Sequence, residues 1–170
     1  MLDEPALGPE FDAPFPAPAE EPVVLESIRA LVHREPFAVL CTQAGGQPYG
    51  SLVAFAFSQD LRSFVFATPV ATRKYRLLSE CDHVALLVDN RGSFPDDMMK
   101  VSAVTVTGRA SQVQPGAGFE RWANLLTSRH PYLKAFVQSP STALFRVDVV
   151  RHLHVTRFQE VRQWIPASDG

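Results

Sequence analysis

Cysteine is scarce in this chain, which also lacks a long hydrophobic run and a strong excess of one charge. The two cysteines, Cys41 and Cys81, form neither a CxxC pair nor a metal-ligand spacing. We expect reduced thiols in a cytoplasmic protein, although their number alone is also compatible with one disulfide. No apolar run reaches the roughly 18 to 20 residues that span a membrane. The acidic opening MLDEPALGPE lacks the basic start of a secretory signal, so we expect neither secretion nor a membrane partner.

The net charge of −2 is unevenly distributed along the chain. Residues 1–22 hold six acidic residues and no Lys or Arg, which leaves sixteen basic and twelve acidic residues for the rest. This mildly basic body falls short of a nucleic-acid-binding surface, so we expect no nucleic-acid partner. Six of the 14 prolines also lie in 1–22, and proline removes a backbone donor. We therefore predict a flexible acidic arm over 1–22, with the alternative that Phe11 and Phe15 lie across a neighbouring subunit.

Residues 23–170 have the length and composition of a single globular domain. A helical spacing of apolar residues follows Pro22, and three strands are then expected over 37–43, 48–58 and 63–68. Their short connections force antiparallel pairing. The further elements, in chain order, are a helix over 72–80, a strand over 83–89 that is apolar on both faces, a strand over 102–113, helices over 119–129 and 131–137, and a long strand or strand pair over 142–158. The pattern predicts a mainly β fold, a small antiparallel barrel of six or seven strands with peripheral α-helices.

The sequence has no P-loop, GxGxxG, HExxH or GxSxG motif. The informative segment is ATPVATRKYRLL (67–78), which places Thr68, Thr72, Arg73 and Lys74 where a strand ends and a helix begins. A helix N-terminus presents unpaired N–H groups and a partial positive charge. Together with a hydroxyl and two cations it can bind a phosphate. Taken alone, an Arg-Lys pair is more typical of a solvated surface.

Four segments in order resemble the pyridoxamine 5′-phosphate oxidase-like superfamily of FMN-binding split barrels. They are AVLCTQAGGQPYGSLVAFAF (38–57), FVFATPVATRKYRLL (64–78), CDHVALLVDN (81–90) and AVTVTGRASQV (103–113). The first is similar to the family's first hairpin, and the second to its phosphate-binding strand–turn–helix. The other two are similar to the strand that follows and to the strand that closes the barrel. The resemblance implies a split barrel that binds FMN.

The resemblance also implies a homodimer with FMN between the subunits. By this match Ser51, Leu52 and Val53 lie against the edge of the flavin ring. The remaining cofactor-binding residues implied are Ala67 and Thr68 near the ribityl chain and phosphate, Thr72, Arg73 and Lys74 at the phosphate, and Asn90 and Ala103 along the ring. The implied activity is that of an FMN-dependent oxidoreductase, of reductase or oxidase type, on an unidentified small molecule. The alternatives are a haem-binding or flavin-sequestering module without turnover, and a deazaflavin-dependent reductase.

Three departures from true pyridoxamine phosphate oxidases predict that this activity is absent. Ala56 stands where those enzymes have a lysine for the substrate phosphate, and Ser51 stands where they have an arginine. Their C-terminal Arg-x-His motif has no counterpart at the end of this chain. The electrostatic partners of the substrate phosphate are therefore missing. No catalytic acid or base can be named from the sequence.

A few other residues suggest chemistry but are explained more simply by structure. His152 and His154 share one strand face, which suits a metal or haem pair but is more typical of a half-exposed sheet. We expect Cys41 to be a small core residue and Trp122 to pack in the core or an interface. His130 is expected to end a helix. No metal site is predicted.

Overall fold

A computed structural model describes residues 21–157 and 160–167, and its secondary structure follows the predicted order closely. The predicted arm lies outside these residues except for Glu21 and Pro22, which already belong to the first helix. The helices and strands are α1 (Glu21–Arg34), β1 (Phe37–Ala44), β2 (Gln47–Phe57), β3 (Ser63–Pro69), α2 (Arg73–Glu80), β4 (His83–Asp89), β5 (Ala103–Gln112), α3 (Ala117–Arg129), α4 (Lys134–Val137), β6 (Thr142–Thr156) and β7 (Glu160–Trp164). Short 3-10 turns occur at 91–93, 98–100 and 131–133.

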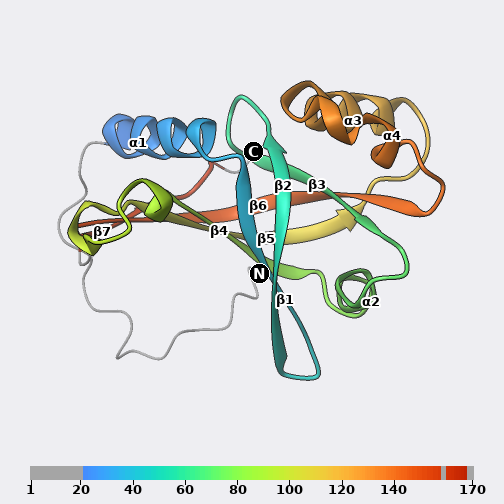
Figure 1. The fold of residues 1–170 in the computed structure, drawn as a ribbon, viewed down its shortest axis with the longest axis horizontal. Coiled ribbons are helices and arrows are strands. Elements are labelled where there is room, and N and C mark those ends of the chain that lie inside the picture. Colours follow the sequence, from blue (N-terminus) through green and yellow to red (C-terminus); the bar gives the residue numbers. More distant parts are fainter. Residues whose placement is uncertain (1–20, 158–159, 168–170) are drawn as a thin grey trace.

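The strands form one antiparallel sheet that closes on itself. Its order is β3-β2-β1-β4-β5-β6-β7, and pairing of β3 with β6 closes a six-stranded barrel. The seventh strand, β7, pairs with residues 152–156 of β6, beyond the part of β6 that pairs with β3. The predicted antiparallel barrel with peripheral helices is confirmed (Figure 1).

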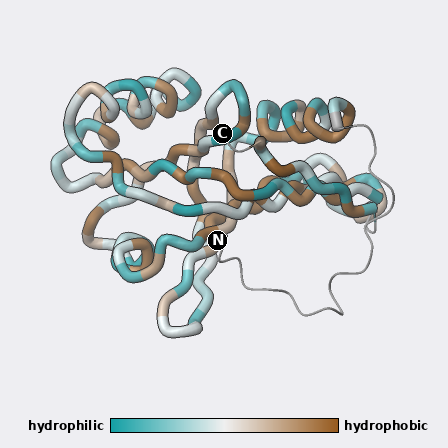
Figure 2. Tube along the Cα trace, turned by 180° about the vertical axis from the view of Figure 1, so that it is seen from behind, coloured by the Kyte–Doolittle hydropathy of each residue, from teal (hydrophilic) through white to brown (hydrophobic). Residues whose placement is uncertain are grey.

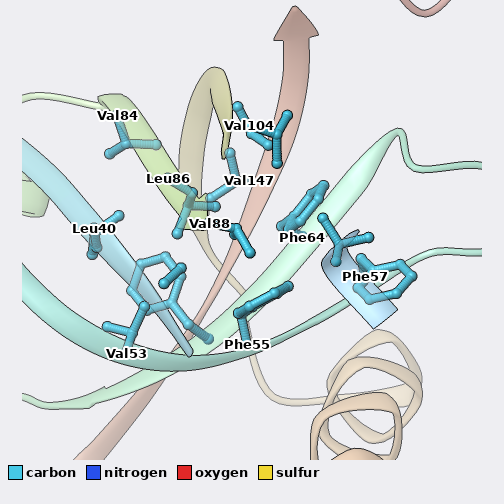
Figure 3. Close-up of a cluster of buried hydrophobic side chains, with 14 of the residues drawn as sticks. Leu40, Val53, Phe55, Phe57, Phe64, Val84, Leu86, Val88, Val104 and Val147 are labelled. Carbon is cyan, nitrogen blue, oxygen red and sulfur yellow. The ribbon is translucent and has the colours of Figure 1, made fainter. Parts of the chain in front are cut away.

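The core fills the inside of the barrel because alternate side chains of each strand point to one face. Leu40, Phe55, Phe64, Leu86 and Val104 are all fully buried. Figure 3 shows these side chains converging from five different strands. The apolar face of α1 packs on the same cluster. A second, smaller cluster lies under α3, where Trp122 is buried as expected.

The β1–β2 hairpin projects beyond the barrel beside α2, as Figure 1 shows. Its tip contains Gly45 and Gly46, both with positive φ, which glycine adopts without steric cost. Figure 2 shows this tip in pale and hydrophilic tones, in contrast to the hydrophobic stretches of the barrel strands. No helix of the described chain is both long and apolar enough to span a membrane.

Several expectations are wrong in detail. β7 was not expected as a separate strand, and the strand over 83–89 is buried on one face only, with Ala85 and Leu87 half-buried on the other. Cys41 is exposed because it falls on the outward phase of β1, and it is a free thiol. His152 and His154 are buried rather than half-exposed, since His152 packs against Phe64 and Trp164 and His154 lies against Ser102 in the β4–β5 connection.

Candidate functional site

The barrel is split between β2 and β3. These strands pair only from Phe55 to Phe57 on β2, against Phe64 to Phe66 on β3. Residues 47–54 of β2 pair with β1 on one side and, within the described chain, with no strand on the other. The end of β3 continues instead along β6 to Pro69 and then leads into α2. The split therefore exposes a strand edge on one side and a helix N-terminus on the other.

The start of α2 is built as the sequence predicts. Thr72 is its N-cap, and its hydroxyl accepts a hydrogen bond of 3.2 Å from the backbone N–H of Tyr75. The same hydroxyl donates to the Pro69 carbonyl at 2.9 Å and lies 3.0 Å from the hydroxyl of Thr68. Thr68 is fully buried. Both hydroxyls are thus engaged within the turn, and the groups left for a ligand are the cations and the first N–H groups of the helix.

Arg73 and Lys74 open this helix with two adjacent positive charges. Neither forms an ion pair with a carboxylate of the described residues, and the first turn of α2 has no acidic residue. The Arg73 guanidinium lies over the Tyr49 ring, 5.2 Å from its centroid. Partial burial lowers the pKa of Lys74 below its ordinary value, because desolvation disfavours the charged form. An anion at this helix N-terminus would compensate both charges.

The opposite side of the split is formed by β2, where the side chains of the three predicted residues point alternately to the inside and the outside of the barrel. Ser51 and Val53 point toward the barrel interior, whereas Leu52 is 68% exposed on the outer surface. The Ser51 hydroxyl is buried and has no hydrogen-bond partner among the described residues. Such an atom is unusual in a folded protein and marks a place where a further polar group belongs. Ala67 lies at the end of β3, half-buried against α3.

Asn90 and Ala103 are not brought to this split within one protomer. Ala103 pairs with Asp89 where β5 begins and β4 ends, Asn90 directly follows Asp89, and β1 separates β4 from β2. Asn90 is buried, and its side-chain oxygen accepts a hydrogen bond of 2.8 Å from the backbone N–H of Ser102. The predicted set therefore divides into a group at the split and a separate pair.

Each of the paired histidines uses its Nε2 in a contact within the chain, whereas its Nδ1 is buried with no hydrogen-bond partner among the described residues. The Nε2–H of His152 donates to the Leu61 carbonyl at 2.9 Å, and Nε2 of His154 lies 2.8 Å from the Ser102 hydroxyl. Burial lowers the pKa of His152 to about 4. Burial and the nearby Arg162 lower the pKa of His154 as well. Within the described ranges no group of three or more His, Cys, Asp or Glu is placed to hold a metal.

The comparisons with known proteins support the split-barrel fold. The family model described as pyridoxamine 5′-phosphate oxidase matches residues 24–156, which is well over half of the chain. The chain belongs to this family. No curated protein matches its sequence significantly.

Solved structures of this fold bind different cofactors. A heme-binding protein from Mycobacterium smegmatis superimposes with a TM-score of 0.74 at 15% identity, covering 84% of this chain and 57% of that one. Campylobacter jejuni ChuZ gives 0.73 at 11% identity, covering 85% and 60%. An FAD-binding protein from Mesorhizobium loti gives 0.62 at 15% identity, covering 76% and 91%. The chain thus spans well under two thirds of the first and second of these proteins, and the similarity establishes the fold alone.

The residues at the split fit a flavin mononucleotide. A phosphate needs cations and N–H donors, which Arg73, Lys74 and the start of α2 provide. The ring of a flavin carries polar edge atoms, which suit the open backbone edge of β2 and the unpartnered hydroxyl of Ser51. A redox cofactor of this kind, when bound, supplies hydride and electron transfer, while the protein binds and orients it.

Proposed function

We propose that this protein is a cytoplasmic FMN-binding flavoprotein with oxidoreductase activity on a small molecule. The observation that carries the proposal is the pair Arg73 and Lys74, which begin a helix at the split without a carboxylate partner among the described residues. Lys74 is half-buried, and such a cation without a counter-ion is costly unless a ligand supplies one; the exposed Arg73 guanidinium is open to the same ligand. Arg73, Lys74 and the first N–H groups of α2 would hold the phosphate, and the β2 edge from Ser51 to Val53 would hold the ring.

We further propose that two copies associate through the outer face of the barrel. Leu52, Val39, Leu87, Thr105 and Leu153 lie in register across neighbouring strands of this face. Leu52 is 68% exposed and the other four are half-buried, so the row is apolar surface in a single copy. Such a face is typical of an obligate dimer interface. In this arrangement the second copy brings its own Asn90 and Ala103 to the ring.

The substrate is not expected to be pyridoxamine phosphate. Ala56, at the position of the substrate-binding lysine, is 2% exposed and packs with Trp122 and Leu126 under α3. The position is therefore filled with apolar contacts and supplies no charge for a substrate phosphate. Purified protein loaded with FMN should consume no oxygen above background when pyridoxamine phosphate is added.

The proposed function is tested by the visible spectrum and by titration with FMN. The purified protein should show flavin absorption near about 370 and 450 nm, or should bind added FMN with a change in flavin fluorescence. A haem Soret band near about 400 nm, with no effect of FMN, would favour the haem-binding alternative. Light scattering with the Leu52→Asp variant tests the dimer. This variant should be a folded monomer, whereas Met98→Asp, at another exposed apolar side chain, should remain dimeric.

A further inference from the structure

Tyr49 is not among the residues that the sequence assigns to the cofactor, yet it contacts one of them across the split. It lies on β2, on the same inward-pointing side as Ser51 and Val53, and the Arg73 guanidinium lies 5.2 Å from its ring centroid. A cation at this distance is attracted by the ring electrons. This contact joins the β1–β2 hairpin to the first residue of α2.

The hairpin that carries Tyr49 is itself held in place. Thr42 faces Tyr49 across the hairpin, and its hydroxyl donates to the Tyr49 carbonyl at 3.3 Å. Gln43, one residue further on, places its side-chain amide 3.4 Å from the sulfur of Cys81, just past the end of α2. The hairpin thus meets α2 near both of its ends, and these contacts hold the backbone of Tyr49 beside the helix.

The contact with the Tyr49 ring occupies none of the N–H donors of the guanidinium, because the Arg73 side chain forms no hydrogen bond with the described residues. Arg73 is exposed and forms no ion pair with a described carboxylate. The N–H donors of a guanidinium point outward in its own plane, which is the geometry that binds a phosphate through two parallel hydrogen bonds. A long arginine side chain otherwise loses considerable rotamer freedom when it binds. The cation–π contact with Tyr49 removes part of that freedom before the ligand arrives.

We infer that Tyr49 is a positioning residue that orients Arg73 toward a phosphate and so favours a phosphorylated flavin over its dephosphorylated form. This inference rests on the proposed function, because it needs FMN at the split. It concerns a side chain whose own hydroxyl has no hydrogen-bond partner among the described residues, so the ring alone is responsible. Phenylalanine should therefore replace Tyr49 without loss.

The test compares the affinities for FMN and for riboflavin, which lacks the phosphate, by flavin fluorescence. Tyr49→Leu should weaken FMN binding roughly two- to fivefold, the strength of one partly exposed cation–π contact. It should leave riboflavin binding unchanged, and Tyr49→Phe should behave as the wild type. In an Arg73→Ala background Tyr49→Leu should have no further effect. Tyr132→Leu, at an exposed tyrosine elsewhere in the chain, is the matched control.

Three results would overturn the inference. An equal loss for FMN and riboflavin, or the same loss in the Arg73→Ala background, would make Tyr49 a purely structural residue. Wild-type protein that binds neither flavin would overturn the proposed function and the inference with it. Thermal melts accompany each titration, and if Tyr49→Leu does not fold, Tyr49→Met, which keeps more of the side-chain volume, is judged by the same criteria.

Discussion

The guanidinium of Arg129 lies 4.6 Å from the centroid of the Phe55 ring, over the strand that borders the split. It also donates hydrogen bonds of 2.5 Å to the carbonyl of Val32 and 2.7 Å to that of Glu35, at the end of α1. The last carbonyls of a helix lack partners within the helix. One side chain of α3 therefore satisfies the end of α1 and packs on β2.

Removal of this side chain should destabilise the fold without affecting the ligand site directly. Arg129→Met should lower the free energy of unfolding by about 2 kcal/mol, since it loses charged hydrogen bonds and a cation–π contact. Arg129→Lys should recover only part of this, because an ammonium lacks the planar, delocalised group that lies over the Phe55 ring. Urea unfolding measures both variants, with Ser128→Ala as the control. Wild-type stability of Arg129→Met would show that water replaces these contacts.

The two cations at the start of α2 should decide flavin affinity. Arg73→Ala and Lys74→Ala should each weaken FMN binding roughly 10- to 100-fold, through loss of a charge-assisted contact of about 1.5–3 kcal/mol. The double variant should lose flavin during purification. Arg76→Ala, one turn along the same helix and exposed, is the control. A double variant that keeps its full flavin content and a wild-type melting curve would place the phosphate elsewhere.

Thr72 should matter for stability more than for the ligand, because its hydroxyl is already engaged as the N-cap. Thr72→Ala should cost about 1 kcal/mol of unfolding free energy, the usual contribution of such a cap. Thr72→Ser keeps the hydroxyl and should be close to wild type. Chemical denaturation and FMN titration of both variants separate the two roles. A large loss of FMN affinity in Thr72→Ala at unchanged stability would assign the hydroxyl to the phosphate instead.

His152 should make the protein less stable in acid. Its pKa is about 4 in the folded chain, against about 6.5 when unfolded. Between these values the unfolded state binds a proton that the folded state does not, so stability falls as the pH drops from about 6.5 to 4 and this effect then levels off. The protonation of His152 alone should lower the free energy of unfolding by about 3 kcal/mol over this range.

His152→Gln tests this, because glutamine can still donate to the Leu61 carbonyl but does not titrate. The wild type should lose more stability than the variant between about pH 6.5 and 4, as measured by urea unfolding at several pH values. His33→Gln, at an exposed histidine, is the control substitution. Parallel curves for the wild type and His152→Gln would mean that His152 takes up its proton at the same pH in the folded and unfolded states.

Much of this fold could be predicted because its elements carry strong local signals. Proline and glycine mark the turns, and Thr72 identifies the start of α2 before any contact is known. The errors come from side chains whose burial depends on distant segments. Cysteine is a residue type that is usually buried, but Cys41 lies on the outward-facing side of β1. β7 is short and polar, so it has little strand signal of its own. It is a strand because it pairs with residues 152–156 of β6.

The candidate site was predictable on one side only. Arg73 and Lys74 follow a strand directly, so a local pattern of strand, turn and helix points to them. The position of Tyr49 depends on the register of the β1–β2 hairpin and on how far β2 diverges from β3. Neither quantity has a signal within a short window of sequence. A hairpin tyrosine that faces the helix could have been suspected only once the split itself was known.

A closed barrel normally leaves no strand edge for another chain to pair with, but this one keeps residues 47–54 of β2 unpaired on one side within the described chain. An open edge of that length is a template for aggregation. Pro48 lies within it and has no N–H to donate, and Gly50 offers no side chain for a foreign strand to pack on. The opening suited to a cofactor therefore also exposes the protein to unwanted strand pairing. Pro48 and Gly50 limit that risk because they make this edge a poor partner for another strand.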